Sequence, residues 1–258
     1  MKSMKMRTKI ILGFASVLVL LAVVGVVSII FLQQATDGFT QYRAWARDSN
    51  LIAEQNESLL MARMNVKDFL IRGTEQEAQE FESYYEEMRG FISEAQEAIQ
   101  NPERAAGVDE VDAKSLDYGA GFDEVVQYQA TRDEHVEILN AVGLQIEQDL
   151  TEILTSAAED DDMIAAYQAS LATRNLLLGR LYAMKFLDDN LPASEERVLQ
   201  EFQEMDEHLT ILDTELQNAQ RRALLENVQS GVQQYLASFP EVTQAIYNRN
   251  DVVENELD

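Results

Sequence analysis

The chain has 258 residues and no cysteine, and its 46 acidic residues against 20 basic ones give a formal charge of −26. Without cysteine, disulfides, thiolate catalysis and cysteine-ligated metals are excluded, and so negative a body is a poor partner for nucleic acid or anionic membrane surfaces. Only 3 prolines and 11 glycines interrupt the chain, which favours long helices over sheets.

The N-terminal segment has the pattern of a membrane anchor. An uncharged apolar run at residues 10–32 is long enough to cross a bilayer as a helix. A cleaved signal peptide is the alternative, but its apolar region would be shorter and would end in a small-residue cleavage site. Four cations precede the run: Lys2, Lys5, Arg7 and Lys9. By the positive-inside rule, residues 1–9 are therefore cytoplasmic and residues 33–258 lie outside the cytoplasm.

The part after the anchor is predicted to be all-α, because apolar residues recur at helical spacing and no two-residue alternation is sustained. Helix-ending signals occur at Gly73-Thr74, Asn101-Pro102, the acidic cluster at residues 160–162, and Asn190-Leu191-Pro192. Together with the internal repeat described next, they predict six helices after the anchor, near residues 33–72, 75–100, 107–158, 162–189, 194–217 and 220–258. The third is about twice as long as the second, so it can serve two bundles.

An internal repeat supports this division. At an offset of 117, residues 56–132 match residues 173–249 without a gap at 19 of 77 positions. Chance would give about 5 matches, so the repeat is significant. Short turns make neighbouring helices antiparallel, which predicts two stacked four-helix bundles. The membrane-proximal bundle is expected at residues 33–132 plus 250–258, and the distal bundle at residues 133–249.

By symmetry with the third helix, the sixth is expected to need some 20 more residues beyond Asp258 to reach the bilayer. The sequence is therefore expected to be truncated before a second membrane span.

Each half of the repeat carries an arginine on an apolar seam, Arg63 in the first and Arg180 in the second. A guanidinium turned into a bundle core needs an anion or hydrogen-bond acceptors to meet it. A ligand carboxylate would suit the planar fork of an arginine. The alternatives are an internal Glu or Asp partner, or an arginine that extends out to water.

Further candidates lie on the third and sixth helices. Tyr118 and its repeat partner Tyr235 could cap a ligand oxygen, although core packing is the more ordinary use of a tyrosine in a bundle. Arg249 could add a second positive charge to a pocket or form a cross-helix ion pair. His135 and His208 do not have the spacing of metal ligands, and no metal or cofactor is predicted. No motif of a catalytic or phosphate-binding site occurs, so the chain is not predicted to be an enzyme.

The anchor, the doubled helical bundle and the two seam arginines together resemble the helical bimodular sensor domain of methyl-accepting chemotaxis proteins. The residues that carry the resemblance are the runs around Arg63 and Arg180, MARMNVKDFL and LGRLYAMKFL, and the paired segments 118–125 and 235–242. In that family, a second arginine can occur one turn before the arginine on the seam. At the two equivalent positions this chain has Leu60 and Leu177. A single arginine suits a monocarboxylate.

The resemblance implies a chemoreceptor of the bacterial inner membrane whose periplasmic part binds small organic acid anions. It also implies a homodimer that drives a cytoplasmic kinase and adaptor through a C-terminal part beyond this sequence. The ligand-binding residues would be Arg63, Arg180, Tyr118, Tyr235 and Arg249. Two alternatives stay open: the sensor half of a membrane histidine kinase, and a structural or protein-binding bundle with no small ligand.

Overall fold

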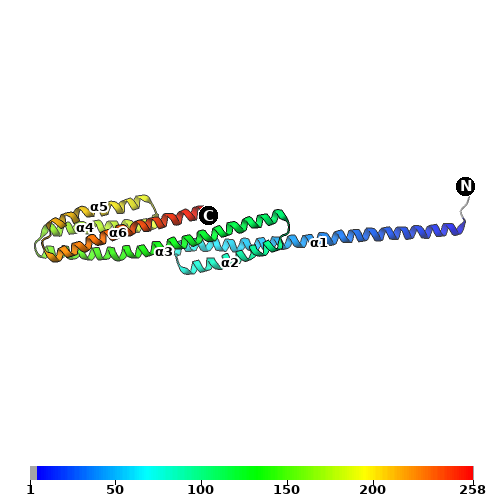
Figure 1. Ribbon diagram of the computed structural model, residues 1–258, viewed down its shortest axis with the longest axis horizontal. Helices are drawn as coiled ribbons and strands as arrows, with labels where there is room; N and C mark the ends of the chain where they lie inside the picture. Colours follow the sequence, from blue (N-terminus) through cyan, green and yellow to red (C-terminus); the bar gives the residue numbers. More distant parts are fainter. Residues whose placement is uncertain (1–4, 258) are drawn as a thin grey trace. The chain divides into compact units, whose positions relative to one another are not determined.

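The computed structural model describes residues 5–257, and this range is almost entirely helical, with no strand (Figure 1). The all-α prediction is therefore confirmed. The elements are α1 (Met6–Arg72), α2 (Glu75–Ala98), α3 (Pro102–Glu159), α4 (Met163–Asp189), α5 (Pro192–Glu215), α6 (Ala219–Val252) and the short π-helix η1 (Val253–Leu257). Lys2, in the predicted cytoplasmic segment, and Asp258, at the predicted end of the outer domain, lie outside the described residues.

The anchor and the first predicted helix of the outer domain form one helix. α1 runs for 67 residues, because no proline occurs between the apolar run and Arg72 and the intervening glycine, Gly38, is tolerated in a helix. Its apolar part is long enough to cross a membrane, and the most apolar stretch is not buried by any other part of the described chain.

The helix boundaries repeat at the offset found in the sequence. Each boundary in the first half has its counterpart 117 residues later: Arg72 and Asp189, Glu75 and Pro192, Ala98 and Glu215, Pro102 and Ala219. The predicted repeat is thus a repeat of structure as well as of sequence. The third predicted helix differs at its start, since it begins at Pro102 rather than near residue 107. Proline has no N–H to lose in the first turn, and its fixed φ suits a helix start.

The caps of the two halves explain why these boundaries coincide. The residue after α1 is Gly73, with φ of 66°, and the residue after α4 is Asn190, with φ of 51°. Both adopt the left-handed conformation that commonly ends a helix. At the next helix starts, Asn101 Oδ1 accepts from two backbone N–H groups of α3, and Asn218 Oδ1 does the same for α6.

The chain forms two compact units. Unit 1 comprises the chain up to Asp68 together with Gln79–Ser115, and unit 2 comprises Phe69–Ala78 together with the chain from Leu116 onward. Unit 1 is built from α1, α2 and the first part of α3, and a buried cluster of Leu51, Ala95 and Ile99 lies in its core.

The larger core belongs to unit 2, where the second part of α3 packs with α4, α5 and α6 (Figure 1). The repeat is visible here in an aromatic pair. Phe69 and Phe122 meet edge to face with ring centroids 5.4 Å apart, and their counterparts Phe186 and Phe239 do so at 6.0 Å. Edge-to-face contacts of this kind add to the gain from burying the rings.

Candidate ligand-binding site

The candidate site is a small cavity in unit 2, enclosed by side chains of α3, α4 and α6. Its volume is about 40 Å³. Its walls are mostly apolar, and Arg180 on α4 is the one ionised side chain among the residues that line it. The lining residues are Val136, Leu139, Asn140, Arg180, Ala183, Met184, Leu187, Tyr235, Phe239 and Val242.

Helix periodicity brings Arg180 to this position. Leu176, Ala183 and Phe186 belong to the buried face of α4, and Arg180 falls between them at spacings of four and three residues. Its side chain is half-buried. Since the turn before it carries Leu176 and the turn after it carries Ala183, the sequence offers no acid on this face of α4.

The guanidinium of Arg180 has no counter-ion in the described part of the chain. Within residues 5–257 it takes part in no hydrogen bond and no ion pair. A half-buried charge without a partner is costly, and the cost falls when an anion binds to it. The sequence allowed three roles for Arg180: a ligand contact, an internal salt bridge, or extension out to water. Within residues 5–257 the internal salt bridge is not found.

Because Gly143 on α3 has no side chain, it leaves room for the side chain of Arg180. A β-carbon at Gly143 would lie 2.9 Å from Arg180 Nε and 3.0 Å from Cδ, closer than side-chain atoms normally approach. The arginine thus lies directly against the backbone of α3. Sequence reasoning missed Gly143, because a glycine inside a long helix carries no sign of what packs against it.

Tyr235 supplies the second polar group of the cavity. It is 2% exposed, and its ring stacks on Phe202 with centroids 4.6 Å apart. Burial raises the pKa of the Tyr235 hydroxyl to about 12, although the nearby charge of Arg180 acts in the opposite direction. The hydroxyl is therefore protonated at neutral pH and can donate a hydrogen bond to an anion beside Arg180.

Asn140 is a third polar side chain at the cavity, contributed by α3. It is exposed, so it marks the side that is open to water. It was not among the residues predicted from the sequence, since exposed asparagines on helices are common and nothing in its spacing distinguishes it.

Arg249 does not line this cavity. It lies half-buried on α6, where it donates to Gln129 Oε1 at 2.9 Å and to Asn250 Oδ1. Burial lowers its pKa, and the neighbouring charge of Arg132 lowers it further. Its cross-helix partner is therefore the neutral amide of Gln129, where the sequence suggested either a pocket charge or an ion pair.

The two remaining predicted residues lie elsewhere. Tyr118 is half-buried on α3 in unit 2, and it is not part of the Arg180 cavity. Arg63 is half-buried on α1 in unit 1, at the position that the repeat makes equivalent to Arg180. The structure thus brings together Arg180 and Tyr235 from the five predicted residues.

His135 and His208, which lack the spacing of metal ligands in the sequence, do not line the cavity. Both are half-buried, and His208 Nδ1 lies 2.9 Å from Gln168 Oε1 across the packed pair of α4 and α5. Among residues 5–257, no group of three His, Cys, Asp or Glu side chains is placed to hold a metal ion.

The two compact helical units define the class of protein as an all-helical bundle protein. Residues 3–142 match a family model described as a four helix bundle sensory module for signal transduction. This match covers more than half of the chain, so the protein belongs to that family, the sensory module of methyl-accepting chemotaxis proteins. A search among curated proteins finds no match to the sequence.

The family places the chain in chemotactic signal transduction. Its members are periplasmic sensors of membrane receptors, which act with cytoplasmic partners and are signalling modules rather than a class of enzyme. The apolar first half of α1 agrees with a membrane receptor. The resemblance inferred from the sequence is thus confirmed at the level of the family.

Proposed function

We propose that the protein is the sensor part of a bacterial chemoreceptor and that it binds a small organic anion at Arg180. The observation that carries the proposal is the guanidinium of Arg180, which lines an apolar cavity without an internal partner in the described chain. A carboxylate there would accept from the guanidinium and from the Tyr235 hydroxyl. In so acidic a protein, a cation left without a carboxylate supports a binding role.

The size of the cavity narrows the ligand class. About 40 Å³ of free space accommodates one or two water molecules or a group of similar size. One arginine supplies one fork, which matches one carboxylate. The cavity can therefore hold a single carboxylate group, which favours a small monocarboxylate such as acetate or propionate over a di- or tricarboxylate.

A thermal-shift experiment on the whole chain in lipid nanodiscs tests this proposal. Acetate, propionate, succinate and citrate are compared at matched ionic strength, because salt alone changes the stability of an acidic protein. A ligand at 100 times its Kd adds about 2.7 kcal/mol to stability. We expect the largest shift with acetate or propionate.

Variants assign the shift to the cavity. Arg180→Ala should remove the part of the shift that arises in this cavity, while Arg174→Ala, at an exposed arginine about two turns earlier on α4, should preserve the whole shift. Equal shifts in both variants, or no shift with any of the acids, would refute the proposal and favour a structural or protein-binding bundle.

Arg63 is proposed as the corresponding residue of unit 1, on the strength of its place in the repeat. Its ligand would also be an organic anion. If Arg63 binds a second anion, then Arg180→Ala leaves a residual thermal shift that the double variant with Arg63→Ala loses. A double variant that behaves like Arg180→Ala alone would limit ligand binding to unit 2.

We further propose that the apolar half of α1 spans the bacterial inner membrane, with the helical units in the periplasm. The cations at its N-terminal end support this orientation. Ligand binding would shift α6 relative to α4, and a cytoplasmic kinase and its adaptor would respond through the receptor's remaining part.

The proposed partner at the periplasmic surface is a second copy of the chain. Among the large apolar side chains that α4 exposes, four have spacings typical of a helix seam: Tyr167, Leu177, Leu181 and Met184 are 50–68% exposed. Two copies inserted in one membrane have the same orientation, so a two-fold axis would place this stripe against itself.

Because the chain has no cysteine, single cysteines can test the dimer cleanly. Leu181→Cys should form a disulfide-linked dimer under mild oxidation, whereas Gln203→Cys on the exposed face of α5 should not. Equal crosslinking at both positions would contradict a dimer built on α4.

A further inference from the structure

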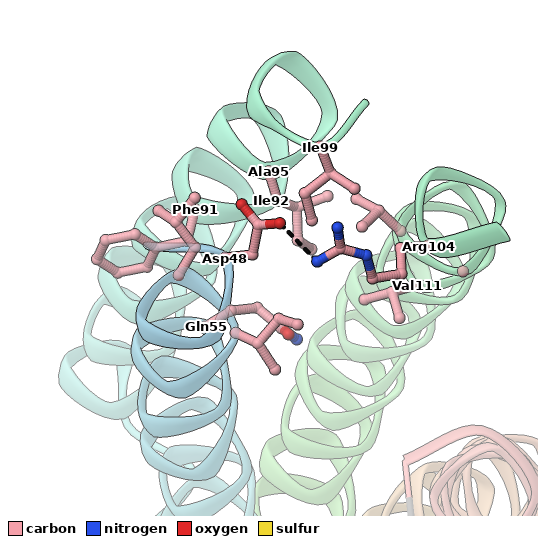
Figure 2. Close-up of a pocket in the computed structure, with 12 residues that line it drawn as sticks. Asp48, Gln55, Phe91, Ile92, Ala95, Ile99, Arg104 and Val111 are labelled. Carbon is pink, nitrogen blue, oxygen red and sulfur yellow. Dashed lines mark hydrogen bonds and ion pairs between the residues drawn. The ribbon is translucent and has the colours of Figure 1, made fainter. Parts of the chain in front are cut away.

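A second cavity lies in unit 1, and its chemistry differs from that of the Arg180 cavity. It has a volume of about 220 Å³ and is enclosed by α1, α2 and the first turns of α3 (Figure 2). Its walls are chiefly aliphatic and aromatic, with Leu51, Phe91, Ile92 and Val111 among them. Apolar cavities of roughly 150 Å³ bind benzene, so this one has room for a substituted ring.

The polar groups of the cavity gather around Asp48. This carboxylate is 4% exposed, and its Oδ2 accepts from Arg104 Nη1 at 2.7 Å (Figure 2). The other oxygen, Oδ1, is buried and has no hydrogen-bond partner within residues 5–257, with Arg47 Nη2 at 3.8 Å. A buried acceptor without a donor costs stability that a bound donor would recover.

The charges around Asp48 decide what kind of donor fits. Two guanidiniums, those of Arg104 and Arg47, already offset the charge of the Asp48 carboxylate. No surplus negative charge is left to hold a cation, and a ligand carboxylate would lie against a buried one. A neutral N–H or O–H group meets neither difficulty. Gln55 adds an amide to the same wall, where it could pair with a second ligand group.

We propose that this cavity is a binding site for a neutral, ring-sized apolar molecule that carries a hydrogen-bond donor, such as a primary aromatic amide. The amide N–H would donate to the Asp48 carboxylate, and its carbonyl oxygen would accept from Arg104 or Gln55. The chain would then sense a second class of compound, independent of the anion at Arg180.

The probe is 4-fluorobenzamide, observed by fluorine NMR as it is titrated with the whole chain in nanodiscs. Its controls are 4-fluorobenzoate, which has the same shape and a negative charge, and 4-fluorobenzylamine, which is a cation. We expect saturable binding of the amide and at least roughly tenfold weaker binding of the acid and of the amine. Equal binding of amide and acid would overturn the proposal.

Two glycines give a matched pair of variants. A β-carbon at Gly107, which lines the cavity, would meet nothing within 4 Å, and the same holds for Gly90 on α2, which does not line it. Gly107→Leu should fill the cavity and abolish amide binding, while Gly90→Leu should leave it unchanged. Both replace glycine by a better helix former, so neither is expected to unfold the protein. Equal amide binding by Gly107→Leu and wild type would place the amide elsewhere, in the lipid for example, and overturn the proposal.

Asp48→Asn tests whether the charge of Asp48 decides the charge of the ligand. Asp48→Asn leaves both guanidiniums without their carboxylate, so the benzoate should now bind better than the amide. An unchanged preference would show that Asp48 does not face the ligand.

Acetate binding at Arg180 should persist in all of these variants, so failure at one site is distinguishable from failure at the other. A Gly107→Leu variant that changes only the sedimentation of the protein would assign the cavity to contact with a second copy.

Discussion

The side chain of Arg180 lies against the backbone of Gly143, so close that a β-carbon at Gly143 would be 2.9 Å from Nε. The contact joins α4 to α3 and holds the arginine in the cavity. Gly143→Ala should therefore displace the guanidinium. Because an arginine side chain is flexible, the fold should change little, whereas acetate binding should weaken by the equivalent of roughly 1–3 kcal/mol.

Titration calorimetry of Gly143→Ala with acetate measures this effect. Gly90→Ala is the matched control, since nothing lies within 4 Å of a β-carbon there. Identical acetate affinities in the two variants would show that the contact does not position Arg180.

The raised pKa of Tyr235 predicts a loss of stability at high pH. Below pH 10 the hydroxyl is protonated in both the folded and the unfolded chain, so it contributes no pH dependence. Between pH 10 and 12 the unfolded chain loses this proton while the folded chain keeps it. The free energy of unfolding should then fall by up to about 2–3 kcal/mol.

Tyr235→Phe should remove this part of the alkaline loss. Urea unfolding of wild type and variant at pH 8, 10 and 11.5 measures both free energies of unfolding, and that of the wild type should fall relative to that of the variant as the pH rises. Parallel curves for wild type and Tyr235→Phe would be inconsistent with the raised pKa.

Gly73 is required by its backbone conformation. With φ of 66°, and with Gln129 Nε2 3.2 Å from the position of a β-carbon, Gly73→Ala should destabilise the protein by about 1–2 kcal/mol. Gly90→Ala should instead stabilise it slightly, because alanine is the better helix former. Urea unfolding at neutral pH compares the two. A neutral effect at Gly73 would mean that the turn after α1 is not held in this conformation.

The two asparagine N-caps should be equivalent. Asn101→Ala and Asn218→Ala each remove the acceptor of two backbone N–H groups, and each should cost about 1 kcal/mol of stability. Asn227→Ala, at an exposed position within α6, should have no such cost. Chemical unfolding curves decide this, and a cost at Asn227 as large as at the caps would refute the capping role.

Four of the five breaks between α1 and α6 could be predicted directly from the sequence, because each has a local cause. Gly73 and Asn190 tolerate the left-handed conformation, while Asn101 and the proline after it form a capped start. The continuity of α1 was harder to predict. A change from apolar to polar composition at Gln33 marks the end of an anchor, but it does not end a helix when no residue there breaks the hydrogen-bond pattern.

The candidate site could be predicted only in part. Seam spacing located Arg180 on the buried side of α4, and the repeat paired Tyr235 with Tyr118. Which of these residues meet depends on packing between helices, which one sequence does not encode locally. Arg249 is an example. The repeat makes it equivalent to Arg132, but only the packed structure shows that its side chain donates to Gln129 and does not reach a ligand site.

α1 is a single helix from Met6 to Arg72, so its apolar half and Arg63 share one rigid axis. A helix turns by about 100° and advances about 1.5 Å with every residue. Deleting one residue between Gln33 and Arg47 would therefore turn everything beyond it by about 100° relative to the anchor. Receptor output should consequently depend on the number of residues in this stretch. It should return after roughly seven inserted residues, because two full helical turns restore the original orientation of α1 beyond the insertion relative to the anchor.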